Sequence, residues 1–190
     1  MRSRTAFPAA MHRVLSRIAI IACLSSTPLS ASRAQEPHDA PMGGEITVPL
    51  DHQVPAGPSA SLRYELGAPF DAARPTVFVI ADAQQFYVRS GAMPALQASL
   101  FGDGFNVVGI LGRATHPAFL HASRDARGHT DWRAAWRVFN SAQWVEDIEA
   151  VRRHLLGERG KVLLYGRSGG AFLIHQYLAL HGDHVERAWT

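Results

Sequence analysis

The sequence predicts an α/β fold in which helices flank a mainly parallel sheet. Short apolar runs rich in β-branched residues occupy residues 76–80, 105–110 and 161–165, and such runs are typical of strands covered on both faces. Segments between these runs carry apolar residues at helical spacing. Because parallel strands need a long crossover connection, strands that alternate with helices favour a parallel sheet.

Two further strands are expected at the start of the domain. Residues 45–50 alternate apolar and polar side chains, and residues 61–66 form a second short strand candidate. The segment 51–60 between them contains Pro55 and Gly57 and is predicted to be a loop. We therefore expect an antiparallel pair here.

Helical spacing predicts helices over residues 93–101, 131–139, 142–156 and 169–181. Gly157 is the expected C-terminal cap of the third helix. The face of that helix predicted to point inward consists of Trp144, Ile148, Val151 and Leu155. In the last helix, the residues predicted to point inward are Phe172, Leu173, Tyr177 and Leu180.

The first 34 residues have the layout of a signal peptide. They contain five arginines and no acidic residue, with a short apolar run over residues 18–24 and small residues up to Ala34. The run is far shorter than the ~20 apolar residues that span a bilayer, so we expect cleavage after Ala34 and export to the periplasm or the exterior of a bacterium. The alternative is a lipobox over residues 20–23 with Cys23 as a lipid anchor, for which the preceding apolar stretch is short.

Charge and cysteine content exclude several classes of protein. The 19 basic and 16 acidic residues give a net charge of +3, but five basic residues lie in the predicted leader, so residues 35–190 carry −2. A nucleic-acid-binding protein needs a basic surface, which this balance does not favour. Cys23 is the only cysteine, so disulfides and thiolate metal sites are excluded from residues 35–190. No metal site or cofactor is predicted.

The most specific signal is the turn Gly166-Arg167-Ser168-Gly169-Gly170. It lies between a predicted buried strand and a predicted helix, the context that a nucleophile elbow requires. Gly166 and Gly170 lack the β-carbons that would collide across so tight a turn. Ser168 is therefore the candidate nucleophile. The amide of Gly169, at the positive end of the following helix, is a candidate oxyanion donor.

With this elbow, the sequence resembles the α/β-hydrolases, and within them the exported proline iminopeptidase-like and tripeptidyl-aminopeptidase-like serine peptidases. The similar stretches are residues 48–52, 105–113, 147–152, 161–177 and 184–188. The resemblance implies a serine hydrolase that works by acyl transfer on a peptide or other small-molecule substrate, without a cofactor. It also implies an α/β-hydrolase fold.

The sequence departs from the family pattern at two places. The family has His-Gly-Gly-Pro-Gly after the strand equivalent to 76–80, where this chain has Ala81-Asp82-Ala83-Gln84-Gln85. By position, the resemblance implies the amide of Ala83 as the second oxyanion donor, with Asp82 and Gln84 as alternatives. Of the family's Asp-x-Arg-Gly only Arg113 is kept, and we expect it to be structural.

The base and the acid of the triad are not predicted within this chain. In this fold both follow the serine, on later loops, and only the residues up to Thr190 follow Ser168 here. We therefore expect residues 35–190 to be the N-terminal portion of an incomplete α/β-hydrolase domain that ends soon after the elbow. Asp183 is interpreted as a helix-terminal residue. The histidines interpreted as surface or packing residues are His129, His175, His181 and His184.

Other interpretations of the elbow stay open. A strand-to-helix turn of this kind also occurs as a phosphate-binding loop or with the serine as a helix cap, although neither Gly-x-x-x-x-Gly-Lys-Ser/Thr nor Gly-x-Gly-x-x-Gly is present. The alternative function is a non-catalytic α/β-hydrolase-like protein that binds a partner and keeps the elbow as a fold element. The catalytic function predicts that a phosphonate probe labels the serine covalently, whereas the non-catalytic function predicts no labelling.

Overall fold

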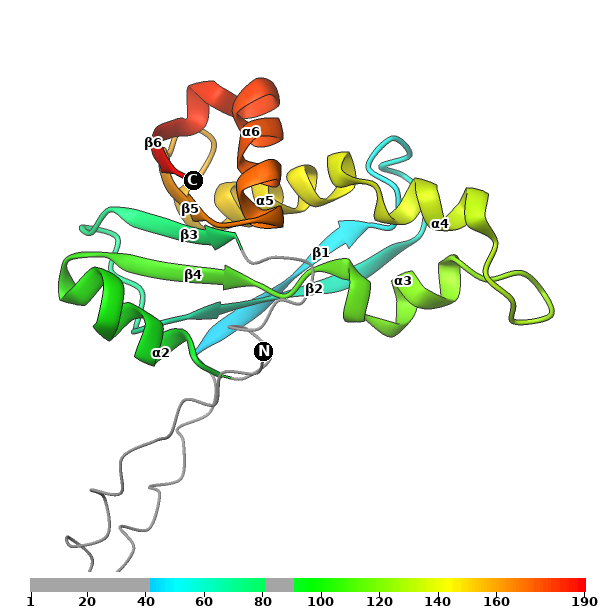
Figure 1. Ribbon diagram of the computed structural model, residues 1–190, viewed down its shortest axis with the longest axis horizontal. Coiled ribbons are helices and arrows are strands. Elements are labelled where there is room, and N and C mark those ends of the chain that lie inside the picture. Colours follow the sequence, from blue (N-terminus) through cyan, green and yellow to red (C-terminus); the bar gives the residue numbers. More distant parts are fainter. Residues whose placement is uncertain (1–41, 81–90) are drawn as a thin grey trace, which may run out of the picture. The chain divides into compact units, whose positions relative to one another are not determined.

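The computed structural model describes residues 42–80 and 91–190 (Figure 1). The predicted leader, including Cys23, and the segment with Ala83 lie outside the described residues. Six strands form one sheet in the order β1-β2-β4-β3-β5-β6. Their bounds are β1 Gly43–Pro49, β2 Ser59–Leu66, β3 Thr76–Ile80, β4 Asn106–Ile110, β5 Val162–Gly166 and β6 Val185–Trp189.

The sheet is antiparallel at one side and parallel over the rest. β1 pairs with β2, and β2 with β4, in antiparallel orientation, which confirms the predicted opening pair. β3 is parallel to both β4 and β5, and β5 is parallel to β6. The parallel strands are separated along the chain by helices, as crossover connections require. The predicted fold class, a mainly parallel sheet flanked by helices, is therefore confirmed.

The helices occupy the expected segments, with additions. The predicted helix at 93–101 is present as α2 followed by the π-helical turn η1, and α3 was not predicted. Among the described residues, no helix is both long and apolar enough to cross a membrane. The helical bounds are α2 Met93–Leu96, η1 Gln97–Phe101, η2 Gly102–Gly104, η3 Arg113–Thr115, α3 Pro117–Ala122, α4 Trp132–Phe139, α5 Ser141–Leu156, α6 Gly169–His181 and η4 Gly182–His184.

Alternation along β3 explains why its apolar run is continuous. Phe78 and Ile80 point to the face covered by α5 and α6, whereas Val77 and Val79 pack with α2 on the opposite face (Figure 1). All five residues of β3 are buried. Because each fully buried apolar side chain of this size contributes about 1.5–3 kcal/mol, both faces stabilise the strand.

Helix α5 ends at the predicted cap, and its start is capped by a residue that was not predicted. Its N-cap Asn140 accepts a hydrogen bond from the amide of Gln143, and Gly157 closes the C-terminus with φ 73°. Ile148 and Val151 of the predicted inward face are buried. The other two members of that face, Trp144 and Leu155, are only half-buried.

The predicted inward face of α6 is partly wrong. Phe172 and Leu180 are 58% and 59% exposed, whereas Ile174 and Tyr177 are fully buried. The buried face runs through Gly170, Ile174 and Tyr177, at spacings of four and three residues, which is one side of a helix. The spacing of apolar residues predicted a neighbouring face because α6 is apolar on most of its surface.

Candidate functional site

Ser168 lies in the turn between β5 and α6 with a backbone conformation that few residues adopt. Its φ is 54° and its ψ is −124°, and it is the one non-glycine residue with positive φ among residues 42–80 and 91–190. Such a conformation costs about 1–3 kcal/mol for a residue with a β-carbon, and strained residues of this kind cluster at active sites. Ser168 is exposed at the carboxyl end of β5. The strand–turn–helix context predicted for the elbow is therefore present.

Close packing explains the glycine at position 166. A β-carbon there would lie 2.8 Å from Cδ1 of Ile174 and 3.0 Å from the carbonyl carbon of Gly170. The turn is closed by a 2.9 Å hydrogen bond from the amide of Gly170 to the carbonyl oxygen of Arg167. Helix α6 can therefore approach the end of β5 only if residue 166 has no side chain.

The candidate oxyanion donors are only partly described. Gly169 is exposed and is the first residue of α6, where amide groups have no acceptor within the helix. It lies next to Ser168, at the positive end of the helix dipole. Ala83, Asp82 and Gln84 lie outside the described residues. Arg167 is exposed in the turn.

Within the described part of the chain, no hydrogen bond or ion pair joins Ser168 to a histidine. The side chain of His129 is 75% exposed, and its Nδ1 lies 3.7 Å from Oδ2 of Asp125. His175 is exposed on α6. The histidines at the other end of α6, His181 and His184, contact glutamates of α5 instead. The roles of Ser168, Gly169 and Ala83 in catalysis stay predictions.

Three stretches that are far apart in the sequence meet in a buried polar network around Arg113. The guanidinium donates from Nε and Nη2 to the two carboxylate oxygens of Asp147, at 2.8 and 2.7 Å, and from Nη1 to the carbonyl oxygens of Leu50 and Val138. Nε2 of His52 lies 2.7 Å from Oδ1 of the same aspartate. Arg113 is fully buried and connects the residue that follows β1 with α4 and α5, so it is structural, as expected.

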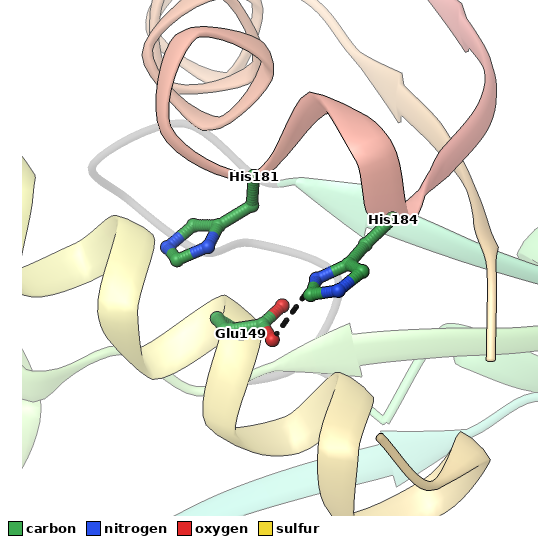
Figure 2. A group of neighbouring side chains, drawn as sticks. All are labelled: Glu149, His181 and His184. Atoms are coloured by element: carbon green, nitrogen blue, oxygen red, sulfur yellow. Dashed lines mark ion pairs between the residues drawn. The ribbon is translucent and has the colours of Figure 1, made fainter. Parts of the chain in front are cut away.

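A second polar cluster lies between α5 and the end of α6 (Figure 2). Glu149 accepts hydrogen bonds from Nε of Arg152 at 2.8 Å, from Nη2 of Arg152 at 2.9 Å and from the hydroxyl of Tyr177 at 2.6 Å. Nδ1 of His184 lies 3.2 Å from Oε1 of Glu149. Nε2 of His181 lies 3.0 Å from Oε1 of Glu146.

The partners of Glu149 stabilise the ionised form of its carboxyl group. Burial alone raises the pKa of its carboxyl group, but the hydrogen bonds from Arg152 and Tyr177 and the charge of Arg152 outweigh burial and lower the pKa to about 2. Burial and the hydrogen bond to Glu149 raise the pKa of Tyr177. Sequence analysis missed this cluster. The signals that could have indicated it are His181-x-x-His184 at a helix end and Glu146-x-x-Glu149 on the preceding helix.

No family model and no curated protein sequence matches the chain. Among similar solved structures, a probable hydrolytic enzyme from Pseudomonas aeruginosa PAO1 has 18% identity, with 78% of this chain and 40% of that chain covered and a TM-score of 0.49. Carboxylesterase CesB from Bacillus subtilis has 15% identity and a TM-score of 0.45, and the match covers 77% of this chain and 41% of the esterase. An alpha/beta hydrolase enzyme from a Medee basin deep-sea metagenome library has 13% identity and a TM-score of 0.46, and the match covers 67% of this chain and 39% of that enzyme.

The chain spans less than half the length of each of these three structures. At these identities and TM-scores, the likeness carries no argument about activity, substrate or individual residues. The strands and helices of the described residues themselves are those of part of an α/β-hydrolase fold, a mixed sheet flanked by helices in which a strand leads through a strained serine into a helix.

Proposed function

We propose that this protein is a serine hydrolase that acts by acyl transfer through Ser168. The observation that carries the proposal is the conformation of Ser168, with φ 54° and ψ −124° at an exposed turn between β5 and α6. A protein does not keep a serine in such a conformation for stability, because glycine would occupy it without strain. Strained, exposed serines at this place in an α/β sheet act as nucleophiles.

In the proposed mechanism, Oγ of Ser168 attacks the carbonyl carbon of the substrate and forms a tetrahedral intermediate. The amide of Gly169 donates a hydrogen bond to the oxyanion, and the amide of Ala83 is the proposed second donor. A histidine must accept the proton of Ser168, and an acid must orient that histidine. Since no described histidine contacts Ser168, the proposal requires both groups from residues that the structure does not describe.

The substrate class follows only from the resemblance of the sequence. An aminopeptidase-like action on peptides is proposed, with esters as the alternative, because both reactions use the same acyl-enzyme chemistry. We further propose that residues 1–34 direct export and that the protein acts in the periplasm or outside the cell.

A specific observation favours a second function. The described residues offer Ser168 no base, and the segment with Ala83 replaces a glycine-rich loop. A non-catalytic α/β-hydrolase-like protein would keep the elbow only because α6 must pack on β5, as the contacts of Gly166 show. Such a protein would bind a small molecule or a peptide without cleaving it.

Covalent labelling with a fluorophosphonate probe separates the two functions. Residues 35–190 and a longer coding sequence that supplies the proposed base and acid, called the full reading frame below, should be expressed side by side, each with and without Ser168→Ala. Ser99→Ala is the matched control, because Ser99 is also exposed but lies on η1. We expect the full frame to be labelled at Ser168 and residues 35–190 alone to be unreactive, since loss of the base costs several orders of magnitude in rate. No labelling in either form would favour the non-catalytic function.

A further inference from the structure

Three groups able to bind a metal ion meet where the end of α6 lies against α5. Glu149, His181 and His184 each offer one ligand atom, and these atoms all lie within 4.8 Å of one another. Figure 2 shows His184 pointing toward Glu149, with the ring of His181 nearby. His181 is the last residue of α6, His184 is the last residue of η4, and Glu149 lies on α5. Imidazole nitrogen and carboxylate oxygen are ligands that Zn²⁺ prefers.

The contact between His184 and Glu149 has the geometry of two ligands of one ion. Nδ1 of His184 lies 3.2 Å from Oε1 of Glu149, yet Nδ1 is buried and makes no hydrogen bond within the described part of the chain. Two ligands of a tetrahedral zinc ion, each at about 2.0–2.1 Å from the metal, lie about 3.3 Å apart. A buried ring nitrogen left without a hydrogen bond needs an explanation, and a shared cation supplies one.

Glu146 orients His181 for the same role. Nε2 of His181 lies 3.0 Å from Oε1 of Glu146, which leaves Nδ1 of this ring as the nitrogen available to a metal. Metal-binding histidines commonly donate their other ring N–H to a carboxylate, which fixes the tautomer and the ring orientation. The ring planes of His181 and His184 are nearly parallel, at 7°.

Glu149 is held in place with one lone pair unused. Its Oε2 accepts from Nε of Arg152 and from Tyr177, whereas its Oε1 accepts from Nη2 of Arg152. A carboxylate oxygen has two lone pairs, so Oε1 keeps one for a further partner on the side of His184. The charge of Arg152 and that of Arg153, whose Nε lies 3.9 Å from Oε1 of Glu149, lower the affinity for a cation, and the nearby carboxylate of Glu146 offsets part of this effect.

We propose that Glu149, His181 and His184 bind a zinc ion, through Oε1 of Glu149 and the Nδ1 atoms of the two histidines, with water as the fourth ligand. The ion would hold η4 and the start of β6, which directly follow α6, against α5. The proposed hydrolase mechanism needs no metal, so this site is structural and independent of Ser168.

Zinc binding to the full chain after treatment with a chelator tests the proposal. Isothermal titration with Zn²⁺ should show a saturable site that His184→Ala and His181→Ala each weaken by at least about tenfold, the scale seen when a supporting partner of a metal ligand is lost. His175→Ala is the matched control, because His175 lies exposed on the same helix and its loss should leave binding unchanged. Circular dichroism establishes that each variant is folded. Glu149 is left intact, since its loss would leave the charge of Arg152 buried with carbonyl acceptors but without the carboxylate that balances it.

Substitution with Co²⁺ provides a readout that an ion pair cannot produce. We expect the visible absorption of tetrahedral Co²⁺ with nitrogen and oxygen ligands in the wild type and in His175→Ala, and its loss in His184→Ala. If the contact is only an ion pair between a protonated His184 and Glu149, neither zinc binding nor this spectrum will be seen. That result, or binding that persists equally in His181→Ala and His184→Ala, would overturn the proposal.

Discussion

The hydroxyl of Tyr177 donates a 2.6 Å hydrogen bond to Oε2 of Glu149, and this contact joins the helix that carries the elbow to helix α5. Both residues are buried, at 0% and 3% exposure. The helix that follows Ser168 is therefore fixed by a charged hydrogen bond as well as by the apolar contacts of Ile174.

Tyr177→Phe removes this hydrogen bond without opening a cavity. Hydrogen bonds to charged groups contribute about 1.5–3 kcal/mol, so we expect the free energy of unfolding in urea to fall by about that amount. Tyr165→Phe is the matched control. Tyr165 is half-buried and makes a ring contact with Phe101. Its hydroxyl forms no hydrogen bond with residues 42–80 or 91–190, so its change should stay within about 0.5 kcal/mol. Equal effects of the two substitutions would show that the contact with Glu149 contributes little.

The same contact predicts a dependence of stability on pH. The pKa of Glu149 is lowered to about 2 in the folded protein, against 4.5 as its ordinary value. A carboxyl group with a lowered folded pKa stabilises the fold above its unfolded pKa, and this contribution is lost as the pH falls through the folded value. In Tyr177→Phe one of the hydrogen bonds that lower the pKa is missing, so acid unfolding of metal-free protein should begin at higher pH than in the wild type. Acid titration followed by circular dichroism, with Tyr165→Phe as control, would contradict this if the two variants unfold at the same pH.

The network around Arg113 predicts that lysine cannot replace this arginine. Lysine has one ammonium group and cannot reach both oxygens of Asp147 and two carbonyl oxygens at once. We expect Arg113→Lys to destabilise the protein by about 3–5 kcal/mol, the range for breaking a buried ion pair. Arg63→Lys is the control, because Arg63 is 38% exposed at its side chain and pairs with Glu65, so its loss should cost at most about 1 kcal/mol. Similar melting temperatures of the two variants would show that the bidentate contact is not needed.

The parallel strands β3, β4 and β5 could be predicted because both of their faces are buried, which produces the uninterrupted apolar run of β3. The parallel strand β6 was not predicted from its residues, which are half-buried or exposed. Helix α5 was predicted to within one residue at its start because Gly157 and the spacing of Ile148 and Val151 agree. Helix α6 was predicted as a helix, but its inward face was assigned wrongly for Phe172 and Leu180. Apolar residues nearly surround that helix, so their spacing does not show which side meets the sheet.

The polar clusters could not be predicted from local sequence. His181 and Glu146 are 35 positions apart, and Arg113 and Asp147 are 34 positions apart. Their contact depends on how α5 and α6 pack on the sheet, which periodicity does not specify. The elbow could be predicted because its strand, turn and helix are consecutive in the sequence, so the strained turn depends only on neighbouring residues.

Gly166→Ala should disturb the elbow directly. The added β-carbon would lie 2.8 Å from Cδ1 of Ile174 and 3.0 Å from the carbonyl carbon of Gly170, so either α6 or the turn must move. We expect a loss of about 1–3 kcal/mol, the usual cost of overpacking, together with loss of phosphonate labelling in the full reading frame. Gly104→Ala is the matched control, since a β-carbon there meets nothing within 4 Å. Normal labelling of Gly166→Ala would show that the turn tolerates the shift and that the position of Ser168 is less constrained than its contacts indicate.

Ser168→Gly is expected to stabilise the protein while removing the proposed nucleophile. The residue has φ 54° and ψ −124°, a conformation that costs about 1–3 kcal/mol with a β-carbon and little for glycine. Glycine loses about 0.5–1 kcal/mol more conformational entropy on folding, so a net gain of roughly 0.5–2 kcal/mol in the free energy of unfolding should remain. Ser168→Ala keeps the β-carbon and therefore the strain, and its stability should stay close to that of the wild type. The comparison of the two variants in urea isolates backbone strain from the loss of the hydroxyl group. If Ser168→Gly is no more stable than Ser168→Ala, then Ser168 is not strained in solution. The proposed function would then lose the observation on which it depends.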